Sequence, residues 1–89
     1  QTVPEQAPPA PPAKRMNPIR VRQLQERCET LEEEIARVEA EIAGYESELS
    51  NFRSAEETIR VSALLEQRRA DLAALMSEWE DISMQLESV

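Results

Sequence analysis

A run of basic side chains near the start of the chain is the feature best suited to binding a charged partner. Residues 14–27 hold five bases against the single acid Glu26, a local charge of +4. The five bases are Lys14, Arg15, Arg20, Arg22 and Arg27. Such a cluster suits the phosphate groups of a nucleic acid. It could instead only solubilise a helix start, but bases there oppose the helix dipole and cost some stability, which favours a partner.

The rest of the chain is strongly acidic. The 89 residues contain 18 acids and 10 bases, a net charge of −8, and residues 28–89 alone hold sixteen acids and five bases. An acidic surface repels nucleic acid, so we expect such a contact to be confined to the basic stretch. Three consecutive residues of a helix point in different directions, so the glutamates at 32–34 cannot converge on a metal ion. We interpret them as a solvated helix face.

The composition excludes several kinds of active site. The chain has no histidine, one cysteine and one glycine, which rules out a structural zinc site, a disulfide framework, a histidine-based triad and a glycine-rich phosphate loop. No apolar run is long enough for a membrane span or a signal peptide. We therefore expect a non-catalytic fragment without catalytic, cofactor-binding or metal-binding residues and without membrane contact.

Proline and two helix-start signals divide the chain. Five of the six prolines fall in the first twelve residues, so residues 1–16 are predicted to form a disordered Pro/Ala-rich linker rather than a ligand for a proline-recognition domain. This linker stands at the very start with no initiating Met, which suggests a longer parent protein. Asn17-Pro18 predicts one helix start, and Ser54 with Glu57 forms a capping box that predicts a second. We expect helices over about 18–50 and 55–88, with a turn at 51–54.

Both predicted helices carry an apolar stripe with heptad spacing. The first stripe is Val21, Leu24, Cys28, Leu31, Ile35, Val38, Ile42, Tyr45, Leu49 and Phe52. The second is Thr58, Val61, Leu65, Arg68, Leu72, Leu75, Trp79, Ile82, Leu86 and Val89. Heptads sustained over this length predict a coiled coil, and a short turn makes the helices fold back on each other. The predicted fold is all-α, an antiparallel two-helix coiled-coil hairpin over residues 17–89.

Two pairings of the helices, one heptad apart, are compatible with this pattern. The first places Leu24 opposite Trp79 and predicts two ion pairs, Arg27 with Glu78 and Glu32 with Arg69. The second places Leu24 opposite Leu86 and brings together two pairs of like charges, Glu34 with Glu78 and Glu41 with Asp71. Since like charges at flanking positions disfavour a pairing, the first is favoured.

Three residues within the stripes stand out. Arg68 is predicted to pack its aliphatic stem and to extend its guanidinium to a glutamate such as Glu32 or Glu39; alternatively, it sets the register of the two helices. Cys28 is interpreted as a small buried hydrophobe, because free cysteine is commonly buried and no second cysteine exists for a disulfide. Trp79 is predicted to bury its indole between the helices near their open end, whereas base stacking would need an exposed ring.

The order of these segments resembles a known domain. A Pro/Ala-rich tether and the basic entry Lys14-Arg15-Met16-Asn17-Pro18 precede Glu/Ala/Ile heptads, a Ser-Ala-Glu-Glu-Thr turn and a closing segment Ser-Glu-Trp-Glu-Asp-Ile. Over residues 14–88 the chain resembles the C-terminal coiled-coil domain of the ABC-F family, Uup-like proteins with two ATP-binding cassettes and no membrane domain. The resemblance implies a cytoplasmic accessory domain of a ribosome-associated ATPase. It also implies binding to DNA or ribosomal RNA, with the ATPase cassettes of the parent chain lying upstream.

Carried over by position, the resemblance places the contact on the same five basic residues. The acidic second half departs from the more basic members of the family, so binding along the whole hairpin is not expected. The main alternative is a protein-interaction or homodimerisation coiled coil, because a small two-helix core contributes only about 3–5 kcal/mol by itself. A rigid spacer whose length matters more than its surface is a third possibility.

Overall fold

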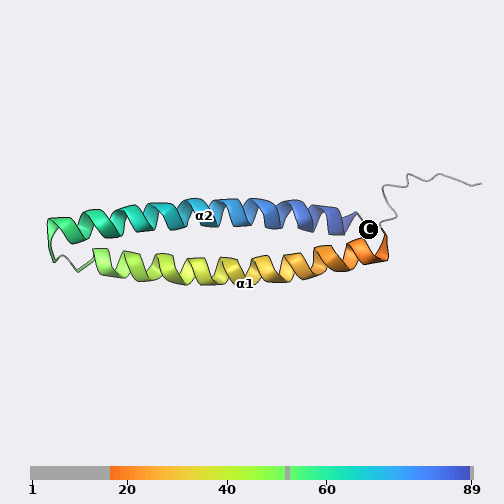
Figure 1. The fold of residues 1–89 in the computed structure, drawn as a ribbon, viewed down its shortest axis with the longest axis horizontal. Coiled ribbons are helices and arrows are strands. Elements are labelled where there is room, and N and C mark those ends of the chain that lie inside the picture. The colour runs from red at the N-terminus through yellow and green to blue at the C-terminus, as the bar shows by residue number, and fades with distance from the viewer. Residues whose placement is uncertain (1–16, 52, 89) are drawn as a thin grey trace, which may run out of the picture.

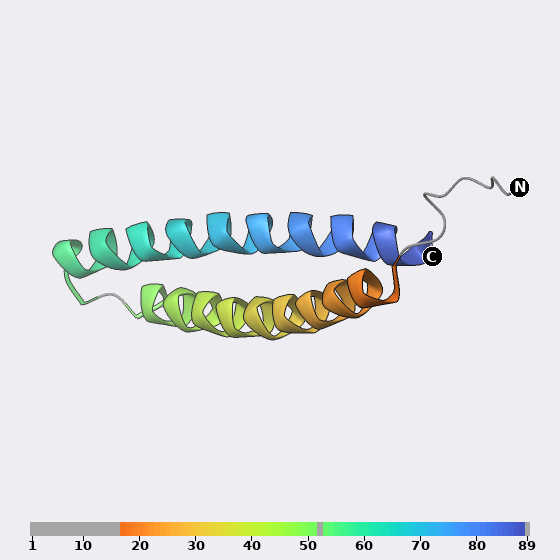
Figure 2. The ribbon, with the colours of Figure 1, turned by 45° about the vertical axis from the view of Figure 1, so that its right-hand side comes forward.

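The chain forms two long antiparallel helices joined by one short loop. The computed structural model describes residues 17–51 and 53–88, in which α1 spans Pro18–Leu49 and α2 spans Ala55–Glu87. The helices lie side by side, with the loop at one end and the start of α1 beside the end of α2 at the other (Figures 1 and 2). We call these two ends the tip and the open end. The predicted all-α hairpin is confirmed, whereas the linker predicted over residues 1–16 lies outside the described residues.

Side-chain caps define both ends of α1. Asn17 Oδ1 accepts a hydrogen bond from the Ile19 backbone N–H at 2.8 Å, and proline occupies the first turn, as expected. At the other end, the Ser50 hydroxyl donates to the Ser47 carbonyl oxygen at 2.6 Å, and the Asn51 amide donates to the same oxygen at 3.3 Å. The Ser50 backbone N–H also donates to this oxygen, at 3.2 Å, so three donors converge on one carbonyl of the last turn.

The start of α2 carries half of the predicted capping box. Ser54 Oγ accepts a hydrogen bond from the Glu57 backbone N–H at 3.0 Å. The Glu57 carboxylate pairs with Arg60 on the next turn. Two acids in this first turn also favour the helix dipole. The cap therefore fixes the first residue of α2 at the predicted position.

The two apolar stripes face each other and form the core. Six side chains are buried among the described residues: Leu24, Leu31, Val38, Val61, Leu65 and Ile82. The other described stripe positions are half-buried, since each helix is covered on one side only. Leu31 is 0% exposed and packs with Leu24 and Ile82 in one cluster. Along the described residues, neither helix has an apolar stretch long enough to cross a membrane.

The interhelical ion pairs combine features of both predicted pairings. Arg27 contacts Glu78, as the first pairing predicted. Arg69 contacts Glu46 at 2.8 Å, so the predicted pairing of Arg69 with Glu32 was wrong.

The like-charge pair that counted against the second pairing is present, with a cation beside it. Arg68 contacts both Glu41, at 3.3 Å, and Asp71. One guanidinium thus offsets the repulsion between two carboxylates. Repulsion between Glu41 and Asp71 was predicted to disfavour the second pairing. That prediction was wrong, because it left out the arginine that contacts both carboxylates.

Candidate nucleic-acid interface

The first three turns of α1 position three of the predicted basic residues. Arg20 and Arg22 are exposed on these turns. They are two residues apart and therefore lie on different sides of the helix. Arg27 lies two turns further along, on the same side as Arg20. The remaining candidates, Lys14 and Arg15, lie outside the described residues.

Arg27 is committed to a contact between the helices. Its Nε donates to Glu78 Oε2 at 2.8 Å and its Nη2 donates to Glu78 Oε1 at 3.0 Å. This bidentate geometry is the favourable one for a guanidinium and a carboxylate. The hydrogen bond with Arg27 lowers the pKa of Glu78, and the same bond raises the pKa of Arg27. Arg27 thus joins α1 to α2 through two of its donors, although its side chain remains 42% exposed.

Arg20 and Arg22 differ from Arg27 in this respect. Among the residues that the structure describes, neither has a carboxylate oxygen within the 4.0 Å of an ion pair. Their positions at the positive end of the helix dipole make both charges electrostatically unfavourable there. An anion bound beside them would relieve that cost.

The open end is less basic than the sequence alone predicted. Arg20 and Arg27 line a groove whose opposite wall, on α2, includes Glu78 and Asp81. Residues 78–88 carry four acids and no base. The predicted charge of +4 was counted along one segment, and the antiparallel fold places an acidic segment beside it. The acids at 78–88 could have been included in the predicted charge, because a hairpin necessarily brings the end of the second helix to the start of the first.

Trp79 anchors the open half of the hairpin. It packs against the cluster around Leu31, and its Nε1 donates to Glu32 Oε2 at 3.1 Å. Cys28 packs against the same cluster, and its Sγ lies 3.8 Å from that carboxylate oxygen. Trp79 therefore packs near the open end as predicted but is only half-buried, and Cys28, predicted to be buried, is half-buried as well. An indole held between the helices is unavailable for stacking on a base.

Arg68 occupies a core position of α2 and is half-buried. Its stem lies in the stripe while its guanidinium reaches the edge, as predicted for a long amphipathic side chain. The partner differs from the prediction: it is Glu41 at 3.3 Å, together with Asp71, rather than Glu32 or Glu39. The exposed acids of both helices do not gather into a metal site. Within residues 17–51 and 53–88, no group of three or more potential ligands could hold an ion.

Comparison with protein families gives one match, which decides the family. Residues 21–84 match the model of the ABC transporter C-terminal domain. The chain belongs to this family. The predicted resemblance to the C-terminal domain of an ABC-F-type protein is thereby confirmed. Comparison with curated proteins gave no match, and comparison with solved structures gave none either.

The matched range contains nearly all of both helices of this ABC transporter C-terminal domain. It begins at Val21, the first residue of the apolar stripe, and ends within the last turn of α2. Arg22 and Arg27 lie inside the range, whereas Arg20 lies one residue before it. The family match therefore supports an accessory coiled-coil domain, and the basic entry lies largely outside its limits.

Proposed function

We propose that this ABC transporter C-terminal domain binds nucleic acid through the linker-proximal turns of α1. The observation that carries the proposal is the exposure of Arg20 and Arg22 without a carboxylate partner among the described residues. Lys14 and Arg15 would extend this surface along the chain toward its start. Arg27, predicted from the sequence as a fifth contact, is better assigned to the pair with Glu78.

The ligand chemistry is that of a phosphate backbone, in DNA or in ribosomal RNA. Arginine presents several N–H donors to phosphate oxygens and releases condensed counterions when it binds them. The acids at 78–88 repel phosphate, so the contact is restricted to the turns of α1 at the open end. The domain would be a non-catalytic, cytoplasmic part of an ATPase whose cassettes lie elsewhere in the parent chain.

Salt dependence tests the proposal. Fluorescence anisotropy would measure the affinity for a labelled DNA duplex and a labelled RNA hairpin over a range of salt concentrations. We expect log affinity to fall with log salt by about 0.9 per phosphate contact on duplex DNA and about 0.7 on a single strand. The double variant Arg20→Gln/Arg22→Gln should lower this slope by the amount expected for about two phosphate contacts.

The matched control changes the same number of charges at the tip. Arg53→Gln/Arg60→Gln removes two exposed arginines and should leave the slope unchanged. Absence of binding at low salt would contradict the proposal, as would an equal loss in the tip variant.

A protein-interaction role is the second candidate, and exposed apolar side chains favour it. Ile19, Ile59 and Met84 are each at least 67% exposed. A two-helix core is thin, and a second copy would cover more apolar surface than one hairpin can. Light scattering decides between the candidates: a stable dimer that does not bind nucleic acid supports the second.

A further inference from the structure

Each acid of α1 that pairs with Arg68 or Arg69 of α2 has another acid one heptad before it. Arg68 contacts Glu41 at 3.3 Å, and Glu34 lies seven residues before that partner. Arg69 contacts Glu46 at 2.8 Å, and Glu39 lies seven residues before it. α1 therefore offers these two arginines an equivalent pair of carboxylates one heptad closer to the open end.

The charges at the open end repeat in the same way. Arg27 contacts Glu78, while Arg20 and Asp71 lie seven residues before the two partners. If α2 moved by one heptad toward the open end, Glu78 would come beside Arg20 and Asp71 would come beside Arg27. Both new pairs join opposite charges, so the displaced arrangement is also electrostatically matched.

The core and the loop are compatible with the same movement. Leu24, Leu31 and Val38 lie seven residues apart on α1, as do Leu75 and Ile82 on α2, so a shift of one heptad exchanges apolar side chains for apolar ones. At the tip, α2 begins beyond the end of α1, and the loop spans the overhang (Figures 1 and 2). Movement of α2 toward the open end reduces this overhang and places no added tension on the loop.

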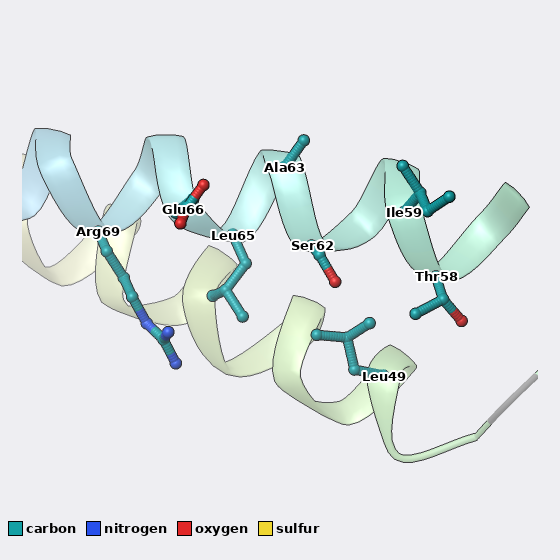
Figure 3. Close-up of a pocket in the computed structure, with 8 residues that line it drawn as sticks. All are labelled: Leu49, Thr58, Ile59, Ser62, Ala63, Leu65, Glu66 and Arg69. Carbon is teal, nitrogen blue, oxygen red and sulfur yellow. The ribbon is translucent and has the colours of Figure 1, made fainter. Parts of the chain in front are cut away.

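The tip holds the observed register only weakly. The last described stripe residue of α1, Leu49, lines a groove whose other residues come from α2. Its side chain lies near the hydroxyl-bearing Thr58 and Ser62, with Leu65 one turn further along (Figure 3). Polar neighbours contribute little packing energy to this layer. Selection of the register must therefore come from elsewhere in the hairpin.

We propose that the hairpin has two registers one heptad apart, and that the observed one is favoured because Arg68 pairs with Glu41 across the helices and keeps Asp71 of its own helix as a second partner. In the displaced register, Arg27 would compete for Asp71, and Arg68 would have Glu34 in place of Glu41. The displacement is one heptad, or about 10.5 Å along the axis. A shift of α2 along α1 would therefore change which charged residues pair at the open end.

The displaced register has a consequence for the open end. Arg20, which is exposed in the observed register, would be paired with Glu78 and withdrawn from phosphate. This consequence rests on the proposed function, whereas the existence of two registers does not.

Distance measurement between spin labels tests the two registers. Labels at the exposed positions Glu26 and Ala63, each changed to cysteine in a Cys28→Ala background, report the axial offset of the helices. The background should show one distance. Glu41→Gln weakens the hold of Arg68 in the observed register only, so a second distance, shorter by roughly 10 Å, should appear in about a tenth of the molecules or more.

Glu34→Gln is the matched control, because it removes the same charge one heptad away and should retain the single distance. Circular dichroism would confirm that the helices remain. Should Glu41→Gln unfold, Glu41→Ala carries the same test, because it removes the same carboxylate and alanine favours the helix. A single unchanged distance in the folded test variant would overturn the proposal, as would an equal second distance in Glu34→Gln.

Discussion

The two halves of the hairpin combine apolar burial and ion pairs in different proportions. The half near the open end contains the apolar cluster of Leu24, Leu31 and Ile82, to which Trp79 adds its indole, and one interhelical ion pair, Arg27 with Glu78. The half near the tip buries smaller side chains, among them two valines, and contains two interhelical ion pairs, those of Arg68 and Arg69. Apolar burial is non-directional, whereas an ion pair depends on which residues lie opposite each other.

This difference separates stability from register. An apolar cluster contributes a large free energy but accepts any register that places apolar residues opposite one another. Exposed ion pairs contribute little stability each, yet they distinguish one register from the next. We therefore expect substitutions of buried apolar residues to reduce stability most, and substitutions at Arg68 or its partners to act mainly on register.

The largest expected effect is at Leu31, the least exposed residue of the open half. Leu31→Ala should lower the free energy of unfolding by about 3 kcal/mol, because it removes buried methyl groups and leaves a cavity. The matched control is Ile59→Ala at the tip, where the side chain is 70% exposed and the loss should stay below about 0.5 kcal/mol. Chemical denaturation measures both, and equal losses would contradict the assignment of stability to apolar burial.

A smaller effect is expected at Trp79. Trp79→Phe removes the donor to Glu32 while keeping an aromatic ring between the helices, and should cost about 1 kcal/mol. The cost should shrink in a Glu32→Ala background, where the hydrogen bond is already absent. A double-mutant cycle followed by thermal unfolding measures that coupling, and a coupling of zero would show that the indole acts by packing alone.

The smallest expected effect is the pH dependence of the Arg27–Glu78 pair. Because the hydrogen bond from Arg27 lowers the pKa of Glu78 in the folded state, the folded state binds fewer protons in acid than the unfolded chain. The stabilisation is present above the ordinary glutamate pKa of about 4.3 and is lost as pH falls through the depressed pKa. Glu78→Gln should remove this component from the pH dependence of the denaturation midpoint. An identical acid limb in the variant would contradict it.

The helices could be predicted from the sequence to within one residue at each end. Their caps, Asn17 and Ser54, depend on local hydrogen bonds that residue type alone indicates. The register could not be predicted in the same way, because an apolar stripe with heptad spacing looks the same after a shift of seven residues. Repulsion between like charges counted against the second pairing, and Arg68 offsets that repulsion because it contacts both Glu41 and Asp71.

The candidate site was predicted less completely than the fold. The basic residues were identified correctly as a cluster along the chain, but their neighbours on α2 were left out of the charge count. Arg27 and Glu78 were predicted to lie near each other, yet Arg27 was still counted among the contacts to phosphate. Carboxylates on the facing helix, rather than charges along the same helix, decide which of these arginines has an ion-pair partner.

The central claim is that Arg20 binds phosphate while Arg27, on the same side of α1, joins the two helices. The most direct test is the salt dependence of duplex DNA binding by Arg20→Gln and Arg27→Gln, each confirmed as folded by circular dichroism. We predict that Arg20→Gln lowers the slope of log affinity against log salt by about 0.9, the value of one contact, and that Arg27→Gln leaves it unchanged. Equal reductions in the two variants, or a reduction in Arg27→Gln alone, would contradict the account.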